Sequence, residues 1–495
     1  MKGGIGLGAV LLIVAPAVCT AQQYLVRLDG RVQTAAYRGV RLDSIPVGQV
    51  VPAPSGGSQT PDGFAADCEP GRAYCSFFRA GAKQSGGPWT TTADLTVWGL
   101  GVTGLSVHGN ARLGVDLGSS QVWPGTEPAV QVFEAYAEYA DTRITGRLGR
   151  QIETGRLGYT GYDGAHLTWR FGRTGLAAIG YAGLGLARST ALPVTSDVLR
   201  PLDDFQPTRR QIVAGGALEW TGSRAEARVE YQRQVDRETK FFVSERAALS
   251  ATLRLLPGWS LTGGTEYDFD YGWWGTSEVT LRHDRRWGGG SVGLRRYRPY
   301  FDLWTIWGAF SPVPYRAVNG SFWLAPIHRL RLRGSIETYK YDSAAANAPL
   351  VRTVREGARW SAGATVEITD ALSLDGGYRH EFGSGAASQG FDGSLNFRPI
   401  DAVTLTAEGG HLVRPLEFRI DNPALTWYGL SVNVRATERL RIGLGALRYD
   451  ENRRRPDVSS IDWSQTRFRA TLSWLFGSSV DRLALPPAVR REGRR

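Results

Sequence analysis

Beyond its first 21 residues, the sequence lacks any apolar run that approaches the roughly 20 residues a membrane-spanning helix needs. Methionine occurs once, cysteine three times, and lysine is rare because arginine supplies nearly all of the 58 basic residues. Glycine, in contrast, occupies 62 of the 495 positions, tyrosine 19 and tryptophan 16. This composition disfavours helical bundles and suits strands joined by tight turns. No shift in composition divides the chain into several domains.

The N-terminus has the layout of a secretory signal peptide. Lys2 precedes an apolar stretch from Ile5 to Val18, which ends in the small residues Cys19-Thr20-Ala21. We expect cleavage after Ala21, so that residues 1–21 form the signal peptide. A lipoprotein interpretation through Cys19 is disfavoured, because valine is a poor residue before a lipidated cysteine. The mature protein is therefore expected outside the cytoplasm.

Two cysteines, Cys68 and Cys75, remain after removal of the signal peptide. In an exported protein, such an isolated close pair is expected to form a disulfide that closes a small loop. The alternative, a metal or redox site, has no further cysteine or histidine nearby to supply ligands.

The clearest pattern in the chain is the alternation in residues 461–476, which read IDWSQTRFRATLSWLF. One face carries Phe468, Leu472 and Trp474, and the other carries Arg467 and Arg469. Side chains of a strand alternate between its two faces, so this strand is apolar on one side and cationic on the other. The pattern recurs along nearly the whole chain, which is typical of a transmembrane β-barrel with an apolar outer wall and a polar lumen. The closing Trp-Leu-Phe resembles the C-terminal assembly signal of outer-membrane barrels, except that a basic tail follows.

The spacing of the alternating segments predicts an all-β fold. We expect an antiparallel up-and-down transmembrane barrel of about 22 strands, within a range of roughly 18 to 24. Short connections alternate with long ones, so we assign the short turns to the periplasm and the long loops to the extracellular side. The barrel is expected to span residues 22–476. Residues 39–88 form a long first extracellular loop and are the only candidate to occlude the lumen, and residues 477–495 form a basic periplasmic tail.

Arginine decides which face meets lipid. An arginine on the lipid face at mid-depth costs about 2–4 kcal/mol, so the alternating Arg329, Arg331 and Arg333 must face the lumen. Five cations fall instead on the apolar face near strand ends, where the cost is small and head groups are within reach: Arg150, Arg233, Lys340, Arg435 and Arg448. The predicted pore-lining residues are Arg112, Arg143, Arg147, Arg224, Arg228, Arg246, Arg254, Arg329, Arg331, Arg333, Arg359, Arg379, Arg439, Arg441, Arg467 and Arg469.

These arginines have two interpretations. Rows of unpaired arginine would make the lumen electropositive and favour anionic solutes. Alternatively, inward carboxylates such as Glu138, Glu226 and Glu337 neutralise them in cross-strand pairs. The formal charge of +11 favours a modest preference for anions.

Residues for catalysis or metal binding do not gather in the sequence. The six histidines, including His108, His166 and His283, occur singly with no serine or aspartate at a recognisable spacing. We predict no catalytic residues, no cofactor and no enzyme activity, against the alternative of an outer-membrane hydrolase. The acidic run Glu266–Asp270 offers oxygen ligands for Ca²⁺, yet a solvated rim is the favoured interpretation, and we predict no metal site.

One predicted hairpin carries short motifs. Its strands are Arg143–Ile152 and Tyr162–Phe171, and they contain Leu148-Gly-Arg-Gln151 and Tyr162-Asp-Gly-Ala165. This hairpin resembles the alginate-export-like and related porin families. The resemblance implies a barrel for export or diffusion of solutes, including anionic polysaccharide. It also implies that Arg150 and Gln151 stabilise the loop between the two strands.

Together these patterns predict a bacterial outer-membrane channel, a porin-like conduit for diffusion or export of polar solutes or polysaccharide. The alternative is a barrel that serves as the outer-membrane scaffold of a multiprotein envelope machine for polysaccharide secretion, motility or electron transfer. Expected partners are outer-membrane lipid and lipopolysaccharide, the barrel assembly machinery and a periplasmic partner for the tail, with no nucleic acid.

Overall fold

The computed structural model describes residues 23–53, 57–118, 130–186, 211–236, 242–298, 314–342, 356–383, 388–413, 424–452 and 463–478. Among these residues, no helix is long and apolar enough to cross a bilayer. The elements are β1 (Gln23–Gln33), β2 (Ala35–Pro46), the 3-10 turn η1 (Val47–Gln49), β3 (Val51–Pro52), β4 (Ser58–Gln59), β5 (Ala65–Asp67), β6 (Tyr74–Gly86), β7 (Pro88–Trp98), β8 (Leu105–Asp116), β9 (Val130–Ala140), β10 (Ile144–Gly155), β11 (Gly158–Arg170), β12 (Leu176–Gly185), β13 (Ile212–Thr221), β14 (Ala225–Val235), β15 (Phe242–Leu256), β16 (Trp259–Asp268), β17 (Trp273–Arg285), β18 (Gly288–Tyr297), β19 (Tyr315–Ile327), β20 (Leu330–Tyr341), β21 (Glu356–Thr369), β22 (Leu372–Phe382), β23 (Gln389–Ile400), β24 (Val403–Val413), β25 (Ala424–Arg435), β26 (Leu440–Asn452) and β27 (Trp463–Gly477).

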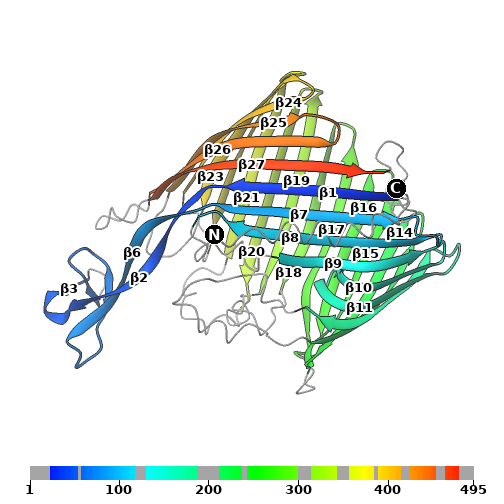
Figure 1. The fold of residues 1–495 in the computed structure, drawn as a ribbon, viewed down its shortest axis with the longest axis horizontal. Coiled ribbons are helices and arrows are strands. Elements are labelled where there is room, and N and C mark those ends of the chain that lie inside the picture. The colour runs from blue at the N-terminus through cyan, green and yellow to red at the C-terminus, as the bar shows by residue number, and fades with distance from the viewer. Residues whose placement is uncertain are drawn as a thin grey trace.

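Twenty-two of these strands, β1 and β7 to β27, form one closed antiparallel sheet (Figure 1). Each strand pairs with the next along the chain, and the last strand, β27, pairs with β1 to close the cylinder. At this seam Val26 lies opposite Phe476 and Val32 opposite Ala470. The prediction of an all-β up-and-down barrel of about 22 strands is confirmed.

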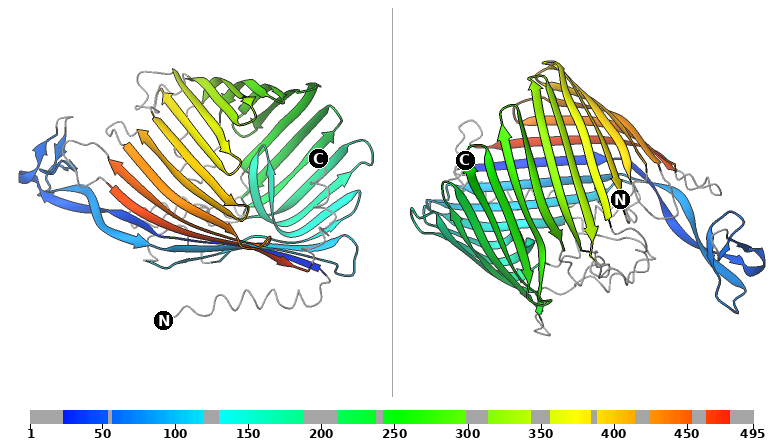
Figure 2. Two further views of the ribbon diagram at one scale, coloured as in Figure 1. Left: turned by 90° about the horizontal axis from the view of Figure 1, so that it is seen from above. Right: turned by 180° about the vertical axis from the view of Figure 1, so that it is seen from behind.

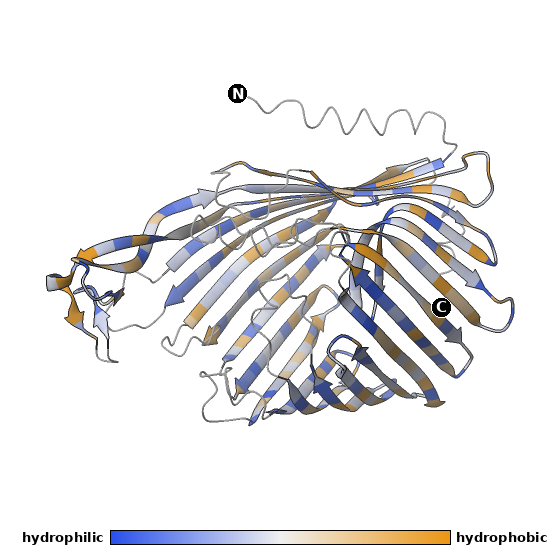
Figure 3. Cartoon of the chain, turned by 90° about the horizontal axis from the view of Figure 1, so that it is seen from below, coloured by the Kyte–Doolittle hydropathy of each residue, from blue (hydrophilic) through white to orange (hydrophobic). Residues whose placement is uncertain are grey.

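Apolar side chains cover the outer wall. Leu148 and Leu430 are each 68% exposed, although both lie within strands, and Val229, Ile336 and Leu444 are also exposed. Colouring by hydropathy shows apolar and polar residues alternating along the strands (Figure 3). A closed barrel leaves no unpaired strand edge, so its backbone is satisfied in lipid, and its exposed apolar wall needs lipid around it. An even-numbered antiparallel barrel of this kind is the architecture of bacterial outer-membrane proteins, and this is where the protein lies.

The segment predicted as a long first loop, residues 39–88, is largely folded into strands. β2 pairs with β6, and β3, β4 and β5 add to the edge of β6 to make a five-stranded sheet. This ribbon projects away from the barrel wall (Figures 1 and 2), so its described part does not occlude the lumen. Cys68 and Cys75 form a disulfide within it, with an S–S distance of 1.99 Å.

The two ends of the chain are not part of this description. The predicted signal peptide, residues 1–21, lies outside the described residues. So does the tail predicted at residues 477–495, apart from Gly477 and Ser478. Both assignments stay predictions.

Leu430→Arg is expected to lower the free energy of unfolding by about 2–4 kcal/mol, because it places a guanidinium on the lipid-facing wall near the middle of β25. Urea titration of the barrel in lipid vesicles, followed by tryptophan fluorescence, measures this loss. Ser431→Arg is the matched control, since Ser431 lies opposite Thr406 on the inward face, and its expected change is within about 0.5 kcal/mol. Equal losses in the two variants would contradict the assignment of faces.

Candidate functional site: the barrel interior

The strand register places alternate residues of every barrel strand on the inward face. Six of the predicted pore-lining arginines bind a carboxylate that neutralises their charge, five of them on this inward face and Arg329 in the turn before β20. The pairs are Arg147–Glu138, Arg228 with Glu219 and Glu230, Arg254–Glu226, Arg329–Asp370, Arg333–Asp375 and Arg359–Glu337. For these six, the cross-strand pairing interpretation holds, and they contribute little net charge to the interior.

Four more of the predicted arginines contact neutral partners. Arg112 donates to Gln131 at 2.5 Å, and Arg467 donates to Gln465 at 3.1 Å. The guanidinium of Arg331 lies 4.8 Å from the ring of Trp323. Arg246 is buried and donates to Ser244 and Gln232. Arg246 also lies directly opposite Asp268 on β16, whereas Arg112, Arg331 and Arg467 form no ion pair with another described residue.

The remaining predicted arginines differ in position. Arg143 and Arg224 lie in turns between strands, at the periplasmic end, and Arg439 directly precedes β26. Arg379, Arg441 and Arg469 lie on the inward faces of β22, β26 and β27.

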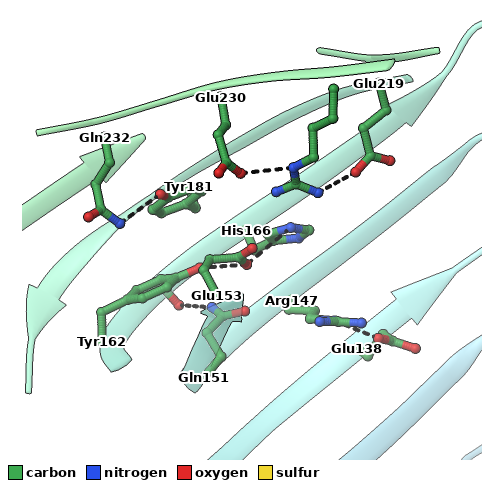
Figure 4. Close-up of polar contacts among 12 residues, drawn as sticks. Glu138, Arg147, Gln151, Glu153, Tyr162, His166, Tyr181, Glu219, Glu230 and Gln232 are labelled. Atoms are coloured by element: carbon green, nitrogen blue, oxygen red, sulfur yellow. Dashed lines mark hydrogen bonds and ion pairs between the residues drawn. The ribbon is translucent and has the colours of Figure 1, made fainter. Parts of the chain in front are cut away.

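A network of buried polar side chains occupies the interior beside β10, β11 and β14 (Figure 4). The carboxylate of Glu153 accepts from the Tyr162 hydroxyl at 3.3 Å and lies 3.3 Å from Nε2 of His166. Gln151 donates to the carbonyl of Gly164 at 3.1 Å, and Gln232 donates to the Tyr181 hydroxyl at 3.1 Å. Tyr162 and Gln151 are almost fully buried, although both lie on the polar face. The lumen is therefore filled on this side of the barrel.

The turn between β10 and β11 reaches across this side of the interior. The backbone N–H of Leu157 donates to Oε1 of Glu230 on β14 at 2.9 Å. Arg156 donates to Oε1 of Glu278 and to the carbonyl of Thr276 on β17, both at 3.1 Å, and its Nε lies 3.8 Å from Glu266 on β16. These contacts join residues more than 70 positions apart in the sequence. The hairpin tip, residues 155–158, thus folds inward and narrows the lumen.

Glycine permits this close approach. A Cβ on Gly155 would lie 2.2 Å from the carboxylate of Glu230, and a Cβ on Gly264 would lie 2.5 Å from the Arg156 guanidinium. Gly158 has a φ of +96°, which strains any residue with a Cβ. The sequence shows these glycines but gives no reason to fold the turn inward, and Arg156 was not among the predicted pore-lining residues. Glu266, predicted to lie on a solvated rim, instead faces Arg156.

The two motifs of this hairpin face each other. Gln151 lies opposite Tyr162, and Arg150 lies opposite Asp163. Arg150 donates twice to the Asp163 carboxylate, at 2.8 and 3.1 Å, and both residues lie on the outer face. The motifs therefore stabilise the pairing of β10 with β11, and the inward bend begins just beyond them.

An uncompensated group of cations lies on the opposite part of the ring. We call Arg31 on β1, Arg441 on β26, and Arg467 and Arg469 on β27 the inner arginine row. Arg31 lies opposite Thr471 and Arg469 opposite Gln33, so the four share one inward face. Among the described residues, no carboxylate lies within ion-pair distance of any of the four.

Acidic residues are scarce around the inner arginine row. In the described parts of β25, β26 and β27, the inward face carries one carboxylate, Glu451, at the extracellular end. Asp29 on β1 is bound by Arg27 at 2.7 Å. Arg435 adds a further cation: the sequence pattern put it on the apolar face, but it lies opposite Arg441 on the inward face. The prediction of an outward Arg435 was wrong.

His108 does not complete a catalytic site. The hydroxyl of Ser106 lies 2.9 Å from Nε2 of His108, but the other ring nitrogen faces the hydroxyl of Thr96 at 3.3 Å instead of a carboxylate. Ser106 is also buried, which leaves no access for a substrate. No group of three potential metal ligands occurs among the residues that the structure describes.

Comparison with known proteins gives similarity at the level of architecture. No family model and no curated protein matches the chain, so the resemblance to alginate-export-like proteins is unconfirmed. A siderophore receptor, PirA from Pseudomonas aeruginosa, is 10% identical over 91% of this chain and 80% of its own, with a TM-score of 0.43. A BenF-like porin from Pseudomonas fluorescens Pf-5 is 10% identical over 93% and 100%, with a TM-score of 0.39. OprD from Pseudomonas aeruginosa is 8% identical over 92% and 95%, with a TM-score of 0.37.

Arg156→Ala is expected to release the hairpin tip, because it removes the contacts with β16 and β17. A nitroxide attached at position 159, where Tyr159 is exposed, would report this release as a narrower electron paramagnetic resonance spectrum. Arg254→Ala is the control, since it also removes an inward ion pair, with Glu226 at 2.6 Å, but leaves the hairpin untouched. An unchanged spectrum in Arg156→Ala would show that the tip is not held by these contacts.

Proposed function

We propose that the protein is a passive outer-membrane channel for polar solutes, with a preference for anions. The observation that carries the proposal is the inner arginine row: four cations on one inward face without a carboxylate among the described residues in ion-pair range. Arginine rows of this kind lower the energy of an anion in a pore. The paired arginines of β9 to β22 lack this effect, because each is neutralised by a carboxylate.

The inward hairpin defines where solutes would pass. It fills the side of the lumen next to β10 to β17, which leaves the remaining cross-section bounded by the inner arginine row. Next to the hairpin lies a polar cavity of about 670 Å³, and the residues that line it include Arg156, Arg228, Thr252 and Arg282. Its polar walls suit water and charged solutes. Selection would therefore combine a narrowed opening with a cationic wall opposite it.

The architecture fits a channel better than a receptor with a separate plug. The described segment before the second barrel strand is the ribbon of β2 to β6, which projects away from the barrel.

A scaffold within a multiprotein envelope machine is the second candidate function. The ribbon favours it, because Leu42 and Phe78 lie opposite each other and are both more than half exposed, as expected for a surface that contacts a partner.

The double variant Arg467→Gln with Arg469→Gln is expected to lower the chloride-to-potassium permeability ratio by at least about sevenfold at low salt. One unit charge changes the energy of an ion about 7 Å away in water by about 0.6 kcal/mol, and two such charges are removed. The reversal potential of the purified barrel in a planar bilayer, under a KCl gradient, measures the ratio.

The matched control is Arg333→Gln with Asp375→Asn. It removes an inward pair whose atoms lie 2.7 Å apart but leaves the net charge unchanged, so the ratio should stay at the wild-type value. Steady conductance with equal ratios in all three proteins would contradict anion preference but keep the channel. A barrel that inserts and stays silent while co-purifying with envelope proteins would contradict the channel and support the scaffold.

A further inference from the structure

The outer wall carries a row of cations that its own acidic residues do not balance. Arg296 on β18 lies directly opposite Arg316 on β19, and Arg316 lies directly opposite Lys340 on β20. We call these three residues the outer cation row. Leu294, two residues before Arg296, lies opposite Val318 and is exposed on the outer wall. The strand alternation therefore places the whole row on the lipid-facing side.

Neighbouring like charges of this kind are unfavourable in a sheet. Two carboxylates offset them in part: Asp342 lies 3.7 Å from Arg316, and Glu356 lies 2.6 Å from Lys340. Arg296 has no such carboxylate among the described residues, and its Nε is buried without a hydrogen-bond partner. The row keeps a net positive charge and an unfilled donor.

Two other outward cations of the barrel are neutralised. Arg150 forms its two-point contact with Asp163, and Arg448 binds Asp450 at 2.9 Å. These pairs show how the sequence balances a cation on the lipid-facing wall. The outer cation row departs from that pattern, because the described residues leave it with more cations than carboxylates.

The row borders an apolar depression in the outer wall. This groove has a volume of about 1440 Å³, and Arg296, Arg316, Lys340 and Glu356 lie at its edge. Its floor and sides include Leu249, Leu253, Leu261, Val279, Leu294 and Val318. The cations occupy the ends of β18 and β20 that lead to the long connections, which is the extracellular side. Charge at the head-group level and an apolar groove beneath it match a lipid of the outer leaflet.

We propose that this surface binds one phosphorylated, multiply acylated glycolipid, the lipid A class of molecule. Its phosphates would contact the outer cation row and its acyl chains would occupy the groove. The three cations lie on adjacent strands about 4.8 Å apart and so span roughly 10 Å, which suits a head group with two phosphates better than a phospholipid with one. Basic residues at the membrane surface attract anionic lipids in this way. This site is independent of the proposed channel.

Native mass spectrometry of the detergent-purified barrel tests the proposal. The protein is titrated, in the presence of a chelator, with bisphosphoryl lipid A, monophosphoryl lipid A and phosphatidylglycerol. One bisphosphoryl lipid A is expected to bind, with about tenfold weaker binding of the other two lipids. The variant with Arg296→Gln, Arg316→Gln and Lys340→Gln should lose about tenfold in affinity for bisphosphoryl lipid A.

Two further variants separate the site from general effects. Arg448→Gln removes an outward cation that is already paired and should bind lipid A like the wild type. Ala251→Trp fills the groove, since Ala251 lines it, and should weaken binding with the cations intact. Heat-modifiable migration in gels confirms that each variant is folded. Wild-type affinity in the triple variant would overturn the site, and equal affinity for phosphatidylglycerol would overturn its assignment to a glycolipid.

Discussion

Hydrogen bonding between β1 and β27 is the constraint on which the rest of the structure depends. Lipid offers no partner for a backbone N–H or carbonyl, so an open sheet edge inside a bilayer would cost several kcal/mol for each unpaired group. Nine register pairs from Leu25 to Gln33 join the two ends of the barrel sequence and remove both edges at once. With the ring closed, every strand must present one face to lipid and the other to the lumen, and the alternating sequence fits that demand on both sides.

The interior is divided by the way its charges are balanced. From β9 to β22 many arginines face carboxylates, and the inward hairpin tip adds Arg156 to this paired network. From β25 to β1 the inward face is cationic, with glycines such as Gly443 and Gly445 beside the arginines. A side on which many arginines are paired thus faces a side on which the inner arginine row is not. The outer wall shows the same contrast: Arg150 and Arg448 are paired with carboxylates, whereas the outer cation row has more cations than carboxylates.

Period-two alternation was enough to predict the architecture, because a barrel repeats one simple rule in every strand. It also placed Arg333 and Arg467 on the inward face. It did not reveal which arginines are paired, since Arg333 meets Asp375 from a strand 42 residues away. The alternation does not predict the inward turn for a related reason, since the contacts of Arg156 are all with residues remote in the sequence. The predicted strands also stop short of the turn: β10 continues past the predicted end at Ile152 to Gly155, and β11 begins at Gly158, before the predicted start at Tyr162. The ribbon of β2 to β6 was assigned as a loop because its glycine and proline content hid the pairing of β2 with β6.

A cysteine scan along β27, with the barrel in lipid vesicles, tests the two-sided wall most directly. Single cysteines from position 466 to 474 are reacted with a water-soluble thiol reagent and, in parallel, labelled with a fluorophore that a lipid-phase quencher reaches. Positions 467, 469, 471 and 473 should react with the water-soluble reagent, and positions 466, 468, 470, 472 and 474 should be quenched from the lipid. A scan without this alternation would contradict the closed barrel and everything inferred from its faces.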